Sequence, residues 1–449
     1  MERANFGSRL GMILATAGSA VGLGNIWRFP YTTGENGGAA FIVIYLVFIL
    51  LLGIPGMVAE FVVGRSAQAN AARAYRVAGG RLWGVTGYIG IFTATTILGF
   101  YSVVAGWCLQ YLYASIVGDL SGDPAYVARY FSEYSSEPLR PILWTLLFLL
   151  VTHLVVRSGV RKGIEKASKV LMPLLFVILI FLVVASCTLP GASEGIKFLF
   201  QPDFSKVTTN TLFEALGQAF FSLSLGCACL VTYSSYFSRK VRLLHSATQV
   251  AIIDTLVAIL AGMMIFPAAF AVGVQPDSGP SLVFITLPNV FHQAFSAMPL
   301  VGHIISILFY ALLTLAALTS TISMHEIGTA FVHEELKMSR GKGACVITAV
   351  CAVIGVFCSL SMGAVEGLTI GGKDLLDLLD DFTSQILLPL GSMLTCLYVG
   401  WRLPKSTVFN EFTNDGTLSA RLFPVFLFLI RYLCPISIFV IFIHQLGLI

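Results

Sequence analysis

The chain has 449 residues, of which 57% are hydrophobic and only 11% are charged. Soluble domains carry about 25% charged residues, and a mean hydropathy of +0.86 excludes a water-soluble protein. The net charge of +4 gives no indication of a nucleic-acid partner. The nine cysteines are scattered through apolar segments, which favours packing over a disulfide framework or a zinc site. The composition therefore indicates an integral membrane protein that lies in a lipid bilayer.

Apolar segments of about 20 residues or more, the length that crosses a bilayer, recur along the whole chain. Each is predicted to be a helix, because a helix pairs its own backbone groups inside lipid. The segments are 8–35, 38–64, 84–116, 140–157, 164–186, 212–238, 244–274, 300–336, 343–362, 376–401 and 420–446. The sequence predicts an all-α polytopic membrane protein with one transmembrane domain over 1–449.

Arginine and lysine are concentrated in alternate loops between these segments. The basic loops hold, among others, Arg65, Arg73, Arg76, Arg157, Arg161, Arg239, Lys337 and Arg402. Because basic loops stay in the cytoplasm, we expect a cytoplasmic N-terminus and, for eleven crossings, an extracytoplasmic C-terminus. The first segment carries Arg3 and Arg9 and lacks a small-residue cleavage site, so we expect a mature helix and not a signal peptide.

Two of the predicted helices are interrupted. A glycine-rich run, Gly18 to Pro30, lies in the first, and the run from Phe221 to Cys229 lies in the sixth. Glycine is costly inside a helix, and lipid tolerates unpaired backbone only where protein or a water-filled cavity surrounds it. Each break opens a block of five helices, 8–186 and 212–401, and an odd number of crossings makes the blocks antiparallel. Such paired breaks point to an inverted-repeat transporter, with 420–446 as an additional eleventh helix.

The first break has a second interpretation. Gly18 and Gly22 are four residues apart and could form a packing face between helices. Asn25 favours a binding site instead, because an amide deep in lipid needs partners that a packing face does not supply. Asp254, alone among apolar residues of the seventh helix, likewise requires a compensating cation, a proton or a buried partner.

Motifs in a fixed order along the chain resemble those of the neurotransmitter:sodium symporter family, in its bacterial, leucine-transporter-like amino-acid branch. They are Gly18–Pro30 with Gly34–Gly38, Gly53–Pro55 with Glu60 and Gly64–Arg65, Tyr101 with Trp107, Lys162–Glu165, Ser222–Gly226, Ala317–Ser320, and Asp377–Ser384. The resemblance implies sodium-driven uptake of a small amino acid by alternating access in a bacterial inner membrane. It implies no organic cofactor and no obligate protein partner.

The resemblance also implies two sodium sites and one substrate site. The first sodium site would contain Ala20, Asn25, Ser222 and Asp254, together with the substrate carboxylate. The second would contain Gly18, Val21, Ala316, Thr319 and Ser320. The substrate would contact Ala20, Gly22, Leu23, Gly24, Ile97, Tyr101, Phe221, Ser222, Ser224, Cys227, Ser320 and Met324.

Two of these positions bear on the substrate. Family members that carry monoamines have an aspartate where this chain has Gly22, so the substrate is expected to bring its own carboxylate. The N-terminal end of the outer half-helix and the Tyr101 hydroxyl would bind that group, although a membrane tyrosine is more commonly a packing residue. Cys227 replaces a phenylalanine of a leucine-preferring relative, which leaves space for Trp, Phe, Tyr, Met or Leu.

Asp254 stands where many members have asparagine. Tyr45, Gln218 and Ser222 match chloride-site residues of the family, but Ala258 replaces a serine of chloride-dependent members. The fixed charge of Asp254 can replace chloride, and its carboxylate can take up a proton. We therefore expect chloride-independent transport, with possible proton antiport.

Further positions match gates. Arg28 and Asp380 match an outer ion pair, above a lid of Phe221 and Tyr101. At the inner side Arg3 matches a residue that pairs with Glu334, and Tyr236 helps to hold the N-terminal tail; ordinary positive-inside anchoring explains Arg3 equally well. Glu60 is expected to accept hydrogen bonds from unwound backbone near the first break, and the loop 275–299 could be a lid or an ordinary loop.

A membrane-embedded enzyme and an ion channel are the disfavoured alternatives. The histidines are dispersed and no nucleophile–base spacing is present. A channel is commonly built around a short pore segment in an oligomer, and the chain has no such pattern.

Overall fold

The computed structural model describes residues 5–120, 124–274, 282–365 and 367–445. Regular structure in these residues is helical except for one isolated bridge between Ile370 and Lys373, so the all-α prediction is confirmed. The α-helices are α1 (Arg9–Ala20), α2 (Phe29–Glu35), α3 (Ala39–Phe48), α4 (Ile54–Ala67), α5 (Ala71–Gly79), α6 (Gly84–Val117), α7 (Pro124–Ser136), α8 (Arg140–Arg157), α9 (Lys166–Cys187), α10 (Ala192–Phe200), α11 (Thr209–Ser222), α12 (Cys229–Ser234), α13 (Leu243–Ala271), α14 (Leu287–Ala294), α15 (Pro299–Glu335), α16 (Arg340–Ser361), α17 (Leu375–Asp381), α18 (Leu388–Leu397), α19 (Lys405–Thr413), α20 (Phe423–Phe428) and α21 (Cys434–Gln445).

Short π-helical turns join several of these helices into longer spans, as Ile49–Gly53 joins α3 to α4. Within the described chain, nine spans are long and apolar enough to cross a bilayer: Ala39–Ala67, Gly84–Val117, Arg140–Arg157, Val160–Cys187, Leu243–Ala271, Pro299–Glu335, Arg340–Ser361, Leu375–Arg402 and Phe423–His444. A tenth is the bent pair Arg9–Ala20 and Gly24–Glu35, which meet at 55°. The remaining predicted segment, 212–238, is divided between α11 and α12. The predicted inverted repeat of 8–186 and 212–401 stays a prediction.

Apolar and polar side chains are distributed as a bilayer requires. Large apolar side chains such as Leu50, Val177 and Ile436 are exposed on the outside of the bundle. Polar and charged side chains, including Asn25 and Asp254, are buried inside it. In water this distribution would be unfavourable, but lipid is as apolar as leucine, so the polar groups must find partners within the protein.

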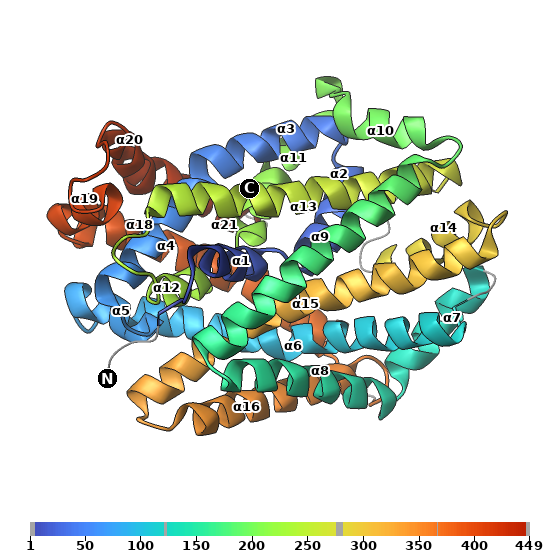
Figure 1. The fold of residues 1–449 in the computed structure, drawn as a ribbon, viewed down its shortest axis with the longest axis horizontal. Coiled ribbons are helices and arrows are strands. Elements are labelled where there is room, and N and C mark those ends of the chain that lie inside the picture. The colour runs from blue at the N-terminus through green and yellow to red at the C-terminus, as the bar shows by residue number, and fades with distance from the viewer. Residues whose placement is uncertain (1–4, 121–123, 275–281, 366, 446–449) are drawn as a thin grey trace.

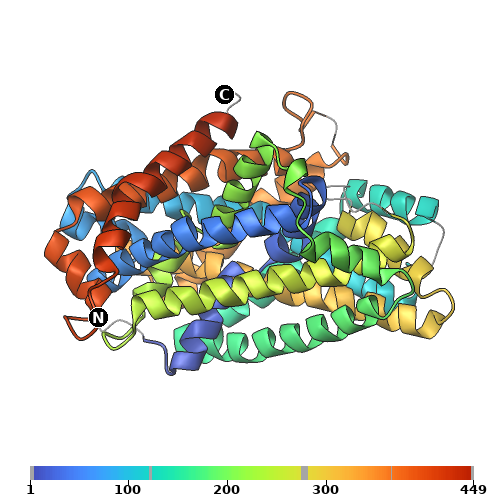
Figure 2. The ribbon, with the colours of Figure 1, turned by 90° about the horizontal axis from the view of Figure 1, so that it is seen from above.

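The longest helices run side by side, and the first helix lies among them. α6 and α15 pack along each other, and α8 and α16 pack against both (Figure 1). α1 is short and packs against α9, α13 and α15 in the middle of the bundle. Seen at right angles, α3, α9 and α13 again run along the length of the bundle (Figure 2). The breaks in the first and sixth predicted helices are therefore enclosed by long, continuous helices.

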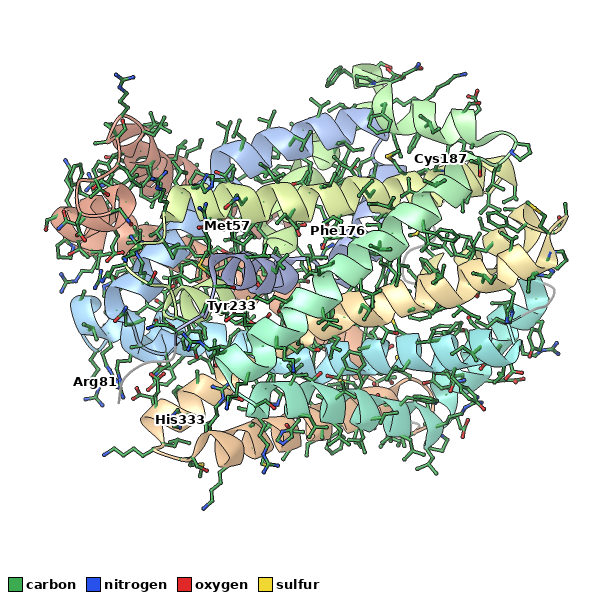
Figure 3. The ribbon with its side chains drawn as sticks, in the orientation of Figure 1. Met57, Arg81, Phe176, Cys187, Tyr233 and His333 are labelled. Carbon is green, nitrogen blue, oxygen red and sulfur yellow. The ribbon has the colours of Figure 1, made fainter. Side chains whose placement is uncertain are left out.

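The two ends of the bundle differ in chemistry. Arg81 and His333 lie at one end and Cys187 at the other (Figure 3). The first end also carries the last turn of α4, which contains Arg65, and the loops that contain Arg239 and Lys337, and we call it the basic end. Of the loop 275–299, expected to be either a lid or an ordinary loop, 275–281 lie outside the described residues, and the rest includes α14 at the opposite end.

Glycines allow a close approach between the second break and α18. Gly226 has a φ of +87°, and a methyl group added at Gly391 would overlap the carbonyl oxygen of Gly226. Gly391→Ala should therefore destabilise the protein by about 1–3 kcal/mol through overpacking. We expect a lower midpoint of thermal unfolding in detergent.

Gly343→Ala is the matched control, because its added methyl group would lie 3.4 Å from its nearest neighbours. Equal melting midpoints for the two variants would contradict the close approach at Gly391.

Candidate functional site

The first break begins at Val21, where the backbone leaves the helical conformation at φ −66° and ψ 111°. The amide of Gly22 donates to Asn25 Oδ1 at 3.0 Å, and the amide of Leu23 donates to the Tyr101 hydroxyl at 3.0 Å. Side chains thus replace the helical partners that these amides lack. The carbonyl oxygen of Val21 faces α15, where two hydroxyl groups meet it.

The second break separates α11 from α12. Ser224, Gly226 and Ala228 all have positive φ values, of 53°, 87° and 61°, so a helix cannot continue through them. The amide of Gly226 donates to Glu60 Oε1 at 2.7 Å. Glu60 was expected to accept hydrogen bonds from the backbone near the first break, but this observed hydrogen bond comes from the backbone of the second break. It lies on α4, which packs beside α12.

One buried polar cluster connects the two breaks. Asn25 Nδ2 donates to Asp254 Oδ1 at 2.7 Å and to Ser222 Oγ at 3.2 Å, and Ser222 Oγ donates to Asp254 Oδ2 at 2.6 Å. The side chain of Asp254 is completely buried, at 0% exposure. Its described partners are amide and hydroxyl groups, with no cationic side chain among them. A buried carboxylate with such partners suits a hard cation such as sodium.

The residues predicted for the second sodium site also lie together. Ser320 Oγ donates to the Val21 carbonyl at 3.1 Å, and Thr319 Oγ1 donates to the carbonyls of Ala316 and Val21 at 2.9 and 3.3 Å. A methyl group at Gly18 would lie 3.3 Å from Thr319. Hydroxyl and carbonyl oxygens are the ligands that a hard monovalent cation takes, so this donor set fits sodium as well.

A cavity of about 100 Å³ lies between the two breaks. All the predicted substrate residues except Leu23 line it, and Leu23 lines the adjoining outer cavity. Asn25 and Asp380, predicted for the sodium site and the outer gate, also line it, as do residues without a predicted role in the site: Ser19, Phe100, Cys229, Thr383, Ser384 and Leu388. Thr383 and Ser384 follow Asp380 by three and four residues, the helical spacing that could have placed them on the same face.

A larger cavity of about 600 Å³ adjoins the first and shares Gly24, Tyr101 and Phe221 with it. Arg28 and Asp380 both line this outer cavity. The guanidinium carbon of Arg28 lies 4.4 Å from the centroid of the Phe221 ring, a cation–π contact. Arg28 therefore contacts the predicted lid, and the Arg28–Asp380 ion pair stays a prediction.

Polar contacts close the basic end. Arg3 lies outside the described residues; its predicted partner Glu334 accepts hydrogen bonds from Asn70, at 2.9 Å from the amide and 3.0 Å from the side chain. The Tyr236 hydroxyl donates to Glu326 Oε1 at 2.6 Å. Arg76 donates to Glu335 at 2.9 Å, and this bond raises the pKa of Arg76 above its ordinary value by favouring the charged form.

Comparison with known proteins identifies the family to which this architecture belongs. The family model described as "Sodium:neurotransmitter symporter family" matches residues 3–135 and 135–448. The chain belongs to the sodium:neurotransmitter symporter family. A crystal structure of MhsT in complex with L-phenylalanine has 43% sequence identity and a TM-score of 0.89, and covers 99% of this chain and 100% of MhsT.

Similar protein sequences support the same family assignment. An uncharacterised sodium-dependent transporter, YhdH, of Bacillus subtilis is 39% identical over 98% of this chain and 97% of its own length. A sodium-dependent nutrient amino acid transporter of Drosophila willistoni is 24% identical over 84% of this chain and 68% of its own length. The protein is a membrane-embedded, sodium-dependent transporter of small molecules and not an enzyme.

Asn25 holds both the first break and the Asp254 carboxylate, so its removal should weaken sodium binding. In wild-type protein, sodium chloride should raise the midpoint of thermal unfolding above that in potassium chloride, because a ligand of the folded state stabilises it. Asn25→Ala should need at least about tenfold more sodium for the same rise in the melting midpoint. This corresponds to a loss of about 1.4 kcal/mol in the free energy of sodium binding.

Ser186→Ala is the control, since it removes a buried hydroxyl that donates to the Met264 carbonyl, away from both cavities. If the sodium concentration that gives half of the maximal rise in melting temperature is unchanged in Asn25→Ala, this residue is excluded from the sodium site.

Proposed function

We propose that the protein imports a hydrophobic or aromatic amino acid together with sodium, by alternating access through the cavity between the two breaks. The observation that carries the proposal is the position of this cavity, which touches the Asn25–Asp254 cluster on one side and apolar walls on the other. We further propose two sodium ions and no organic cofactor, and a location in a bacterial inner membrane with a cytoplasmic N-terminus and an extracytoplasmic C-terminus.

The backbone of the first break and Tyr101 would bind the substrate carboxylate. The Tyr101 hydroxyl accepts from the Leu23 amide, so its own proton is available to donate to a carboxylate. A methyl group at Gly22 would lie 2.5 Å from Ser320 Oγ and 3.1 Å from the Tyr101 hydroxyl. No side chain fits at Gly22, which supports a substrate that supplies its own carboxylate.

The remaining walls would select an apolar side chain. Ile97, Phe100, Met324 and Leu388 contribute apolar surface to the cavity. The thiol of Cys227 donates to the Ser224 carbonyl at 3.1 Å and is therefore occupied within the protein. Trp, Phe, Tyr, Met and Leu are the candidate substrates.

Sodium coupling follows from the same geometry. A carboxylate bound by Leu23, Gly24 and Tyr101 would lie beside Asn25, in the immediate surroundings of Asp254. Sodium between the two carboxylates would lower their mutual repulsion, so each solute favours binding of the other. Coupling of this kind allows a sodium gradient to drive uptake.

Asp254 would make chloride unnecessary. The side-chain amide of Gln218 is buried and has no hydrogen-bond partner among the described residues, and the buried Tyr45 hydroxyl lies beside the hydroxyl groups of Ser222 and Thr255, so polar groups that could bind an anion lie in this region. Ala258 supplies no hydroxyl, and the Asp254 carboxylate already provides a negative charge near these groups. The same carboxylate would take up a proton after sodium leaves, which gives proton movement opposite to sodium.

A competition panel tests the substrate class. Each of the twenty amino acids, and tryptamine, is added as an unlabelled competitor during sodium-dependent uptake of labelled phenylalanine in proteoliposomes. Trp, Phe, Tyr, Met and Leu should inhibit this uptake more strongly than polar amino acids or tryptamine. Stronger competition by tryptamine, which lacks a carboxylate, would contradict the assignment of Gly22 and Tyr101.

Replacement of chloride by gluconate tests the role of Asp254. Wild-type uptake should be unchanged, while Asp254→Asn should lower uptake and make the residual activity depend on chloride, because the fixed charge is gone. Loss of wild-type uptake in gluconate would refute chloride independence. A pH dye inside the vesicles should report loss of protons from the vesicle interior during uptake by the wild type, and no such loss with Asp254→Asn.

A further inference from the structure

Arg431 is a charged residue inside a membrane-spanning segment. It belongs to the span Phe423–His444, in which it is the only aspartate, glutamate, lysine or arginine. The span begins with α20, which lies at the basic end beside α19 (Figure 1). A charge within a span is costly, so it is commonly paired with an acidic side chain or extended to the membrane interface.

The protein supplies only neutral partners to the Arg431 side chain. Nε donates to the Gly400 carbonyl at 2.6 Å, and the guanidinium carbon lies 5.3 Å from the centroid of the Trp401 ring. Gly400 permits this approach, because a methyl group added there would lie 3.0 Å from Arg431 Cγ. In the part of the chain that the structure describes, no carboxylate pairs with Arg431.

The terminal nitrogens of Arg431, Nη1 and Nη2, remain available. Neither has a hydrogen-bond partner among the described residues. Neither belongs to the buried side-chain atoms that lack partners, so both face the surface of the bundle. Their N–H groups can therefore donate to a group outside the protein.

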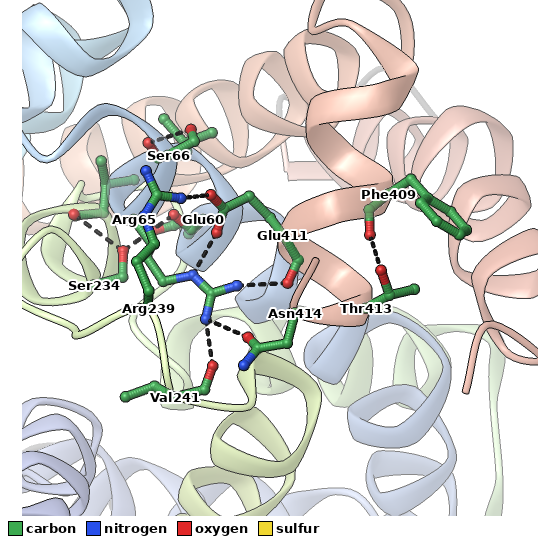
Figure 4. Close-up of polar contacts among 12 residues, drawn as sticks. Glu60, Arg65, Ser66, Ser234, Arg239, Val241, Phe409, Glu411, Thr413 and Asn414 are labelled. Atoms are coloured by element: carbon green, nitrogen blue, oxygen red, sulfur yellow. Dashed lines mark hydrogen bonds and ion pairs between the residues drawn. The ribbon is translucent and has the colours of Figure 1, made fainter. Parts of the chain in front are cut away.

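Arg65 shows how another arginine at the basic end is compensated within the protein. Arg65, at the end of α4, donates to one carboxylate oxygen of Glu411 on α19, and Arg239 donates to the other (Figure 4). Glu411 and Asp415 are the only acidic residues in 403–430, and the charge of Asp415 also acts on Arg65. The acidic side chains nearest to Arg431 in the chain thus serve Arg65.

The surface around Arg431 faces lipid. Exposed apolar and aromatic side chains recur at intervals of three or four residues along one side of this span: Val425, Phe428, Tyr432, Ile436 and Phe439. Trp401, also exposed, packs edge-on against Tyr432 with their ring centroids 5.5 Å apart.

The guanidinium lies at the level of the lipid headgroups. Trp401 is the last residue but one of the span Leu375–Arg402, so it marks the end of that span at the basic end. Tryptophan and tyrosine are typical of the level at which a bilayer meets water. Helical side chains lean toward the N-terminus of their helix, which carries Arg431 in the same direction. Exposed Arg402 and Lys405 add positive charge directly after Trp401.

We propose that Arg431, with Trp401 and Arg402, binds the phosphate group of an anionic phospholipid in the leaflet that surrounds the basic end. Nη1 and Nη2 would donate to the phosphate oxygens, a strong charge-assisted contact. The acyl chains would lie along Tyr432, Ile436 and Phe439, toward the middle of the bilayer. The lipid would neutralise Arg431 where the protein supplies no carboxylate. This inference does not depend on which solute is carried.

Quenching of Trp401 fluorescence by brominated lipid tests the site in the wild-type protein. The full chain is reconstituted in phosphatidylcholine bilayers that contain a small fraction of brominated phosphatidylglycerol or of brominated phosphatidylcholine. The contribution of Trp401 is the difference between protein with Trp401 and the matching Trp401→Phe variant. Brominated phosphatidylglycerol should quench Trp401 at about fivefold lower concentration, the preference expected from one arginine at an anionic lipid surface. Equal quenching by the two lipids would overturn the proposal, whether or not any variant folds.

Arg431→Gln assigns the preference to this side chain. It removes the charge, so the two brominated lipids should quench Trp401 about equally. Arg81→Gln is the matched control, since Arg81 is an exposed arginine at the same end of the bundle and should leave the preference unchanged (Figure 3). A sodium-dependent rise in the melting midpoint shows that each variant is folded. A preference that survives Arg431→Gln, or that Arg81→Gln removes equally, would contradict a site at Arg431.

Inorganic phosphate distinguishes a lipid site from a site for free phosphate. In detergent at constant sodium, phosphatidylglycerol should raise the melting midpoint of the wild type more than phosphatidylcholine does, because a ligand of the folded state stabilises it. Inorganic phosphate should produce no such rise. An equal rise with inorganic phosphate would overturn the assignment to lipid. None of these measurements follows uptake, so their failure is distinguishable from failure of the proposed function.

Discussion

The contact between Asn25 and Asp254 is the interaction on which the rest of the site depends. It joins the first break, where the backbone cannot pair all of its own hydrogen bonds, to Asp254 in the middle of α13, and Ser222 at the start of the second break binds the same carboxylate. Asn25 satisfies the Gly22 amide with one atom and binds Asp254 with the other. The breaks, the cation-binding oxygens and the substrate cavity therefore form one structure, in which loss of one contact affects all three.

The molecule is open toward one end and closed toward the other. The outer cavity of about 600 Å³ extends from the breaks toward the end opposite the basic end, past Tyr31 and Glu214. At the basic end, polar contacts from Tyr236, Asn70 and Arg76 meet α15. This asymmetry is what alternating access requires of one state in the cycle.

Much of the fold could be predicted because its signals are local. Long apolar runs predicted the helices, and glycines together with the isolated Asn25 and Asp254 located the breaks and the polar cluster. What the sequence could not reveal depends on register between distant segments. Glu60 was assigned to the first break but accepts from Gly226 in the second, 166 residues away, and Arg65 meets Glu411 across 346 residues. Thr383 and Ser384 had a usable spacing from Asp380, but only the packing of the helix shows that this face borders the cavity.

Simultaneous measurement of sodium and amino-acid fluxes tests the central claim most directly. Proteoliposomes would receive radioactive sodium and a labelled amino acid that binds, and both uptakes would be followed at several substrate concentrations. The account predicts that sodium entry rises in a constant ratio to amino-acid entry and that both fall together in Asp254→Asn. Amino-acid uptake that proceeds with no accompanying sodium entry would contradict it.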